Sequence, residues 1–112
     1  MLTKFVHEGQ AVDYTPSSDV AAGDVIVQGV LLGVARCAIK AGANGALAVA
    51  GVFDFPKAIG QNMAVAAGVT LFWDAQNKVA TTDSYEGNRR LIGKATAAAG
   101  DNDTTVRVRL TQ

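Results

Sequence analysis

The sequence has little of what enzymes and metal proteins use for their chemistry. Its 112 residues contain one cysteine, Cys37, and one histidine, His7. A disulfide within the chain needs two cysteines, and a zinc site takes several Cys or His ligands. A Ser-His-Asp arrangement would have to use His7, which lies in a predicted strand and is more simply interpreted as a surface side chain. We therefore predict no catalytic residue, no cofactor site and no metal site, and a protein that is not an enzyme.

Excess charge of one sign and long hydrophobic runs are also missing. Ten basic and ten acidic residues give a formal net charge of zero, which argues against direct nucleic-acid binding by phosphate neutralisation. The most apolar stretch, residues 25–52, is interrupted by Gln28, Arg36, Lys40 and Asn44, so it falls short of the roughly 18 apolar residues that span a bilayer. The first eight residues include charges and lack the apolar run of a signal peptide. We expect synthesis in a cytoplasm and no membrane partner.

Two segments come near to known binding motifs and fail. In Gly87–Ala95 the glycines are spaced too widely for a phosphate-binding loop, and Ala95 stands where a magnesium-binding hydroxyl is required. The alternating carboxylates of 101–103 resemble the start of a calcium loop, but the later oxygen ligands do not follow. A solvated turn is the better interpretation of 101–103.

Small and β-branched apolar residues are abundant. The chain has 20 Ala and 14 Val but only 7 Leu, whereas helical proteins are rich in Leu, Glu and Lys and Val favours strands. Twelve glycines, together with clusters of Asn, Asp and Ser, divide the chain at short intervals. This pattern predicts many short strands.

The clearest predicted strand is 104–110, where Val106, Val108 and Leu110 alternate with polar residues. Segments 69–73 and 78–82 predict a hairpin around the turn 74–77. We also expect a strand over 91–97, with Gly93 at a bulge or a close backbone approach. Further strands are expected at 5–7, 11–14, 24–28, 31–39 and 45–55.

The fold class that follows is all-β, a small antiparallel β-barrel or sandwich that forms a single domain over residues 1–112. At most one short helix is expected, and 58–67 is the segment whose Ala and Met content would tolerate one turn. We find no convincing tandem repeat, although 22–25 and 67–70 occupy similar positions before predicted strands.

Several segments follow one another in a specific order, from Phe5-Val6 and the Ala22-Gly23-Asp24 turn to the last strand. The most specific of them are Gly45–Lys57, Gly68–Asp74, Lys78–Thr82, Leu91–Asp101 and Val106–Leu110. In this order they resemble the DUF2190 family of small phage and prophage proteins, which are regarded as capsid cement or head-decoration proteins.

The resemblance implies an all-β module that binds the outside of an assembled phage capsid and stabilises it. The implied partner is the major capsid protein, and the implied location is the virion surface after synthesis in the bacterial host. By analogy with trimeric head-decoration proteins, a homo-oligomer is expected, with a trimer favoured. The family has no catalytic motif to transfer to this chain.

We expect residues 1–15 to form N-terminal strands or an arm that contacts the capsid or a neighbouring subunit. The candidate contact residues are Leu2, Phe5, Val6, His7 and Tyr14. Two other functions remain open. One is another virion component, such as a tail or connector subunit, and the other is a small ligand-binding barrel, which would need a polar cavity with convergent titratable groups.

Overall fold

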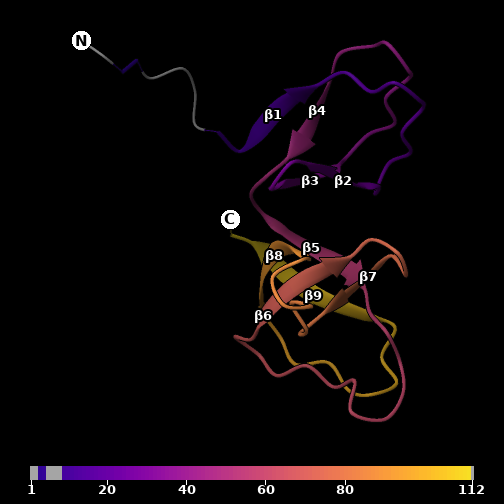
Figure 1. The fold of residues 1–112 in the computed structure, drawn as a ribbon, viewed down its shortest axis with the longest axis vertical. Coiled ribbons are helices and arrows are strands. Elements are labelled where there is room, and N and C mark those ends of the chain that lie inside the picture. Colours follow the sequence, from indigo (N-terminus) through magenta and orange to yellow (C-terminus); the bar gives the residue numbers. More distant parts are fainter. Residues whose placement is uncertain (1–2, 5–8, 112) are drawn as a thin grey trace.

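The structure, a computed structural model, describes residues 3–4 and 9–111 and arranges their strands in two antiparallel sheets (Figure 1). The first sheet has the order β1-β4-β3-β2, and the second has the order β5-β9-β8-β6-β7. The strands are β1 (Ala11–Tyr14), β2 (Val25–Gln28), β3 (Leu31–Ala35), β4 (Gly45–Ala48), β5 (Val52–Pro56), β6 (Thr70–Asp74), β7 (Val79–Thr81), β8 (Arg90–Ala95) and β9 (Thr105–Leu110). The predicted all-β class is confirmed.

The strand patterns read from the C-terminal part of the sequence are confirmed. Along β9, exposed and buried residues alternate without a break, with Val106, Val108 and Leu110 buried. β6 and β7 form the predicted hairpin, in which Trp73 lies opposite Ala80. Gly93 makes the close approach that was expected, because a Cβ at this position would collide with the backbone oxygen of Arg109.

Two predicted strands differ from the structure. The segment 45–55 is not one strand: β4 ends at Ala48 and β5 begins at Val52 in the other sheet, since the chain turns at Gly51, whose φ is 114°. The strand predicted over 31–39 ends at Ala35, and Ile39 makes only an isolated bridge to Val20. Segment 58–67 contains no helix but turns and a bridge at Val65. The predicted strand at 5–7 lies outside the described residues.

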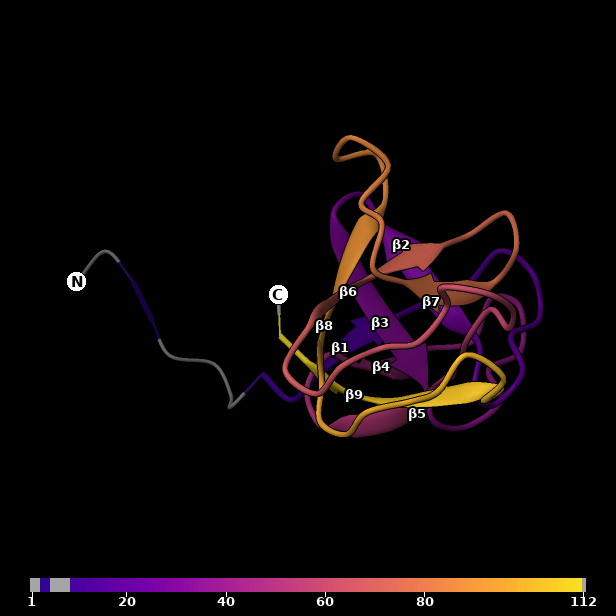
Figure 2. The ribbon, with the colours of Figure 1, turned by 90° about the horizontal axis from the view of Figure 1, so that it is seen from below.

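The larger sheet curls until its two edge strands approach each other. A single parallel bridge joins Lys57, just after β5, to Ala80 of β7. Figure 2 shows the strands of this sheet arranged around an interior. Phe55 and Trp73 meet there edge to face, with ring centroids 6.0 Å apart. The molecule therefore consists of two packed sheets, the larger of which is close to a small barrel.

The two sheets share one strand order, which reveals an internal repeat. Taken in chain order, β1, β2, β3 and β4 of the N-terminal unit (residues 11–48) correspond to β5, β6, β8 and β9 of the C-terminal unit (residues 52–110). Both sets are arranged first-fourth-third-second in their sheets. β7 is an addition to the C-terminal unit. The expectation of no tandem repeat is therefore wrong.

Matching backbone hydrogen bonds support this correspondence. Val20 and Ile39 exchange two bonds of 2.8 and 2.9 Å, and Val65 and Ala99 exchange two bonds of 2.8 Å. A second pair of contacts lies at the turn before the second strand of each unit. The N–H of Gly23 donates to the oxygen of Ala35 at 2.6 Å, and that of Gly68 donates to the oxygen of Ala95 at 2.7 Å.

The apolar residues of the smaller core all have counterparts in the larger one. The smaller cluster consists of Val12, Tyr14, Val20, Ile26, Ala35, Ile39 and Leu47. The corresponding members of the larger cluster are, in the same order, Phe53, Phe55, Val65, Leu71, Ala95, Ala99 and Val108. The repeat thus preserves which positions are buried, while most of the side chains differ.

An insertion explains why the repeat is hard to see in the sequence. Leu-Leu-Gly-Val-Ala-Arg-Cys-Ala-Ile at 31–39 matches Leu-Ile-Gly-Lys-Ala-Thr-Ala-Ala-Ala at 91–99, an offset of 60 positions, but Val20 matches Val65 at an offset of 45. The difference is the 15-residue segment that carries β7. Gly33 and Gly93 are equivalent, and a Cβ would collide at both positions.

The two units are joined where their equivalent third strands meet. β3 contacts β8, and Leu32 and Val34 of β3 belong to the same buried cluster as Ile92 of β8. Leu32 and Ile92 are both completely buried. Two side chains of the N-terminal unit therefore help to complete the core of the C-terminal unit.

We expect Leu32→Ala to destabilise the C-terminal unit, because it opens a cavity in the shared core at a cost of about 2–5 kcal/mol in unfolding free energy. Urea unfolding followed by Trp73 fluorescence, which reports on the C-terminal unit, measures this loss. The control is Val30→Ala, whose side chain is 78% exposed and should change the unfolding free energy by less than about 0.5 kcal/mol.

If the chain is one domain, far-UV circular dichroism and Trp73 fluorescence should give one coincident transition in the native protein. An unchanged Trp73 midpoint in Leu32→Ala would show that the units unfold independently.

Candidate functional site

Of the five contact residues predicted from the sequence, the structure places one. Leu2, Phe5, Val6 and His7 lie outside the described residues. Tyr14 ends β1 and is partly buried, because its ring packs against the core of the N-terminal unit. The proposed contact role of all five stays a prediction.

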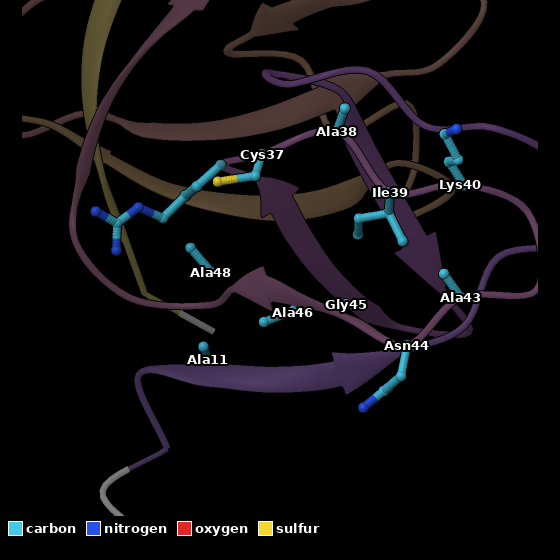
Figure 3. A pocket seen from close by; sticks show the side chains of 11 residues that line it. Ala11, Cys37, Ala38, Ile39, Lys40, Ala43, Asn44, Gly45, Ala46 and Ala48 are labelled. Carbon is cyan, nitrogen blue, oxygen red and sulfur yellow. The ribbon is translucent and has the colours of Figure 1, made fainter.

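An open groove of about 640 Å³ lies on the N-terminal unit (Figure 3). Ala11, Ala46 and Ala48 of β1 and β4 lie along one side. The segment 36–40, which includes Cys37, lies along the other. The lining of the groove is mainly small and apolar, which favours contact with a surface over binding of a polar ligand.

A smaller hollow of about 280 Å³ occupies the equivalent place on the C-terminal unit. Ala97–Ala99 line it, as the equivalent residues 37–39 line the larger groove. Here a cross-strand ion pair is present, in which Arg107 Nε donates to Asp54 Oδ1 at 2.9 Å and Arg107 Nη2 donates to Asp54 Oδ2 at 3.3 Å. In the N-terminal unit the equivalent pair of positions holds Asp13 opposite Ala46.

The contact between Asp54 and Arg107 shifts the pKa of each group so that its charged form is favoured. The hydrogen bond from Arg107, assisted by its charge, lowers the pKa of Asp54. The same contact raises the pKa of Arg107. Both side chains are at least half exposed, so the pair is a solvated surface feature and not a catalytic dyad.

Asp74 at the end of β6 holds two loops together. Its Oδ1 accepts the backbone N–H groups of Gln76 and Asn77 at 3.1 and 3.2 Å. Its Oδ2 accepts the Asn77 side-chain amide at 2.9 Å and Arg89 Nη2 at 3.3 Å. The Arg89 guanidinium also lies over the ring of Tyr85, 5.1 Å from its centre. This network attaches the loop before β8 to the β6–β7 turn.

Lys57 is buried and bonded only to backbone oxygens. Its Nζ donates to Ala58 O at 2.8 Å, to Asp103 O at 3.3 Å and to Asp101 O at 3.4 Å. The ammonium group thus fastens the chain after β5 to the turn before β9. Its three donors are used by these oxygens, which leaves the group a structural role.

Several apolar residues in the loops and in the strands are exposed, which the sequence did not predict. Ile59 and Met63 are exposed in the loop between β5 and β6, where apolar residues within a turn-rich segment were the available signal. Among the residues that the structure describes, the large exposed apolar ones are Val27, Val30, Val52, Ile59, Met63 and Tyr85. Together with the alanine-lined groove, they offer several small apolar contact areas.

Neither metal-binding clusters nor membrane-spanning elements are found in the part of the chain that the structure describes. Within residues 3–4 and 9–111, no group of three or more His, Cys, Asp or Glu side chains is placed to hold a metal ion. The same residues include no helix of the length and apolarity needed to cross a membrane.

A family model described as phage cement protein matches residues 6–110. The chain belongs to the phage cement protein family. No curated protein and no solved structure matches it. The family match covers both units of the repeat and makes the chain a structural virion protein that binds the capsid and stabilises it.

The Asp74 network of this cement protein should make a pH-dependent contribution to stability. Hydrogen bonds from the Asn77 side chain and backbone, with the charge of Arg89, lower the pKa of Asp74 below its ordinary value of 3.8. A carboxyl with a lowered folded-state pKa stabilises the protein above its unfolded pKa, and the contribution is lost as the pH falls towards the folded value.

We therefore expect Asp74→Asn to lower the unfolding free energy at pH 7 and to make progressively less difference as the pH falls below about 4. Urea unfolding at a series of pH values measures this difference. The control is Glu86→Gln, in an exposed position of the loop between β7 and β8, for which we expect little effect at pH 7. A difference between wild type and Asp74→Asn that stays constant from pH 7 to pH 2 would contradict the role of the ionised carboxylate.

Proposed function

We propose that this cement protein binds the outer surface of the assembled phage head through direct contact with the major capsid protein. It acts there as a homo-oligomer, most simply a trimer, and performs no chemical reaction. It is made in the cytoplasm of the bacterial host before it joins the virion. The finer assignment to the DUF2190 group is part of this proposal.

The family match over residues 6–110 is the observation that carries the proposal. The surface is consistent with it: the hollows are open and shallow, and the larger one is lined by alanines. A capsid presents many equivalent sites, so several weak contacts per subunit combine into strong retention when the subunits are linked in an oligomer. Such a mode of binding needs no deep pocket.

Residues 1–15 are the proposed source of the capsid or subunit contact. Leu2, Phe5 and Val6 supply apolar side chains next to the polar His7. Tyr14 supplies the partly exposed edge of a ring that the core holds in place. Anchoring the ring in the core lowers the entropy lost when a partner contacts its exposed edge.

The decisive experiment adds the purified protein to heads assembled without it and measures the mass that sediments with them. We expect saturable binding at a fixed ratio to the capsid protein, and heads that resist a higher temperature before they release DNA. Absence of binding to heads, with co-sedimentation of the protein with tails instead, would overturn the proposal in favour of a tail or connector subunit.

Removal of residues 1–8 tests the contact segment within the same assay. We expect the truncated protein to keep its circular dichroism spectrum, because it retains all nine strands of the described residues, and to bind heads at least tenfold more weakly. A matched substitution, Phe5→Ser with Val6→Ser, should reproduce the loss, whereas Thr3→Ser should not. Unchanged binding by the truncated protein would remove this segment from the interface.

A further inference from the structure

The two repeat units differ at one strand position, which leaves an edge open in the N-terminal unit. In the C-terminal unit, β7 pairs with the outer side of β6. The counterpart of β6 is β2, which is the last strand of its sheet. The chain passes from β2 to β3 through Gly29 and Val30 alone, where the C-terminal unit has the longer segment that carries β7. Within the described residues, β2 therefore lacks the neighbour that β6 has.

The backbone of β2 presents hydrogen-bonding groups to this open edge. The oxygen of Asp24 accepts the N–H of Ala35 at 2.9 Å, so Asp24 faces β3. Because successive residues of an antiparallel strand bond to alternate sides, Ile26 and Gln28 also face β3. Val25 and Val27 then turn their N–H and C=O groups outward. A strand edge of this kind is a template for another strand.

A groove of about 460 Å³ runs beside the same edge. β2 forms one wall with Val25 and Val27, and the other wall includes Trp73, Ala75 and Lys78 of the β6–β7 hairpin. Val27 is 38% exposed in this position. The groove offers an extended segment both apolar contact and main-chain partners, which is the arrangement used when a peptide adds a strand to a sheet.

β1 forms the second open edge, at the opposite side of the same sheet. It has four residues, as β2 has, and among residues 3–4 and 9–111 it pairs only with β4. The oxygen of Gln10 accepts the N–H of Val49 at 3.0 Å, so alternation turns Ala11 and Asp13 towards the outside. The described part of each copy thus has two unpaired strand edges of equal length.

We propose that β1 of one copy pairs with β2 of the next copy, in the position that β7 occupies on β6. The charges of the two surfaces are complementary. Pairing would bring the exposed, negatively charged Asp13 on β1 of one copy to the groove of the next copy, which contains the positively charged Lys78. The other charged group of the groove, Asp24, has its carboxylate bonded to the N–H of Ala21 at 3.0 Å.

A second copy fits this edge better than a segment of the capsid protein does. One head-to-tail contact uses both open edges of every copy, and a ring of such contacts leaves no edge exposed. A capsid segment on β2 would leave β1 unpaired. The inference deepens the oligomer proposed above and rests on that part of the proposed function.

Proline substitutions at the outward-facing positions provide the test. Val27→Pro and Ala11→Pro each remove one donor from an open edge while leaving the bonds within the sheet intact. The matched controls are Val27→Thr and Ala11→Ser, which keep the backbone N–H. Light scattering coupled to size exclusion should give a closed ring, with a trimer expected, for the native protein and both controls. Both proline variants should be monomers with native circular dichroism spectra.

A mixture of the two proline variants distinguishes head-to-tail pairing from other arrangements. Val27→Pro keeps a competent β1 and Ala11→Pro keeps a competent β2, so the mixture should form a one-to-one dimer and nothing larger. Dimers of Ala11→Pro alone would indicate β2–β2 pairing and overturn the proposal. Retention of the native ring by Val27→Pro would overturn it as well.

A charge exchange provides an independent readout. Asp13→Lys should weaken the ring at least tenfold in dissociation constant, and adding Lys78→Asp should restore most of the loss. Failure of the double variant to recover would argue against the proposed contact. A native protein that is monomeric in solution and still saturates heads would overturn the ring while leaving capsid binding intact.

Discussion

The packing of β3 on β8 is the contact on which the rest of the molecule depends. Leu32 and Ile92 occupy equivalent places in the two units and are completely buried in the same cluster. The N-terminal unit has a small core of its own, with four buried residues and three partly buried ones. A core of that size rarely suffices for an independent fold. Its attachment to the larger cluster supplies apolar burial that it cannot provide alone.

The surfaces of the two units differ. The exposed Ala11 of β1 and Ala46 of β4 line the open groove of the N-terminal unit, together with the buried Ala48. The added strand β7 lets the larger sheet curl until a bridge forms between Lys57 and Ala80. As far as the structure describes the chain, the smaller sheet lacks such a strand and ends in open edges. The C-terminal unit, which has β7, therefore nearly closes its own sheet. The N-terminal unit, which has no equivalent of β7, is the unit suited to association.

Three charged sites of the described chain maintain structure. Asp74 gathers the loops around β6, and Lys57 binds three backbone oxygens. The Asp54–Arg107 pair lies in solvent across two strands. Each of these groups is used by neighbours in its own chain. A protein whose role is to hold a capsid together is served by this use of charge, because rigid loops lose little entropy on binding.

Particular elements show which features of the fold could be predicted from the sequence alone. The alternation in β9 and the turn-forming residues between β6 and β7 are local signals, so they predicted strands and a hairpin correctly. The low content of His and Cys limited the chemistry available, and the order of segments pointed to the cement family. The candidate contact residues Leu2, Phe5, Val6, His7 and Tyr14 came from the same local reasoning, and the structure places only Tyr14.

By itself, then, the sequence determined the all-β class, most strand positions and the family, because period-two patterns, turn residues and motif order act over short distances. Tertiary structure alone decided that 45–55 divides between two sheets, that an insertion conceals a repeat, and which strand edges remain open. These features depend on pairing between residues that are far apart in the chain. Equivalent positions of the two units share burial and hydrogen bonds, but most of their side chains differ, so the sequence does not reveal them.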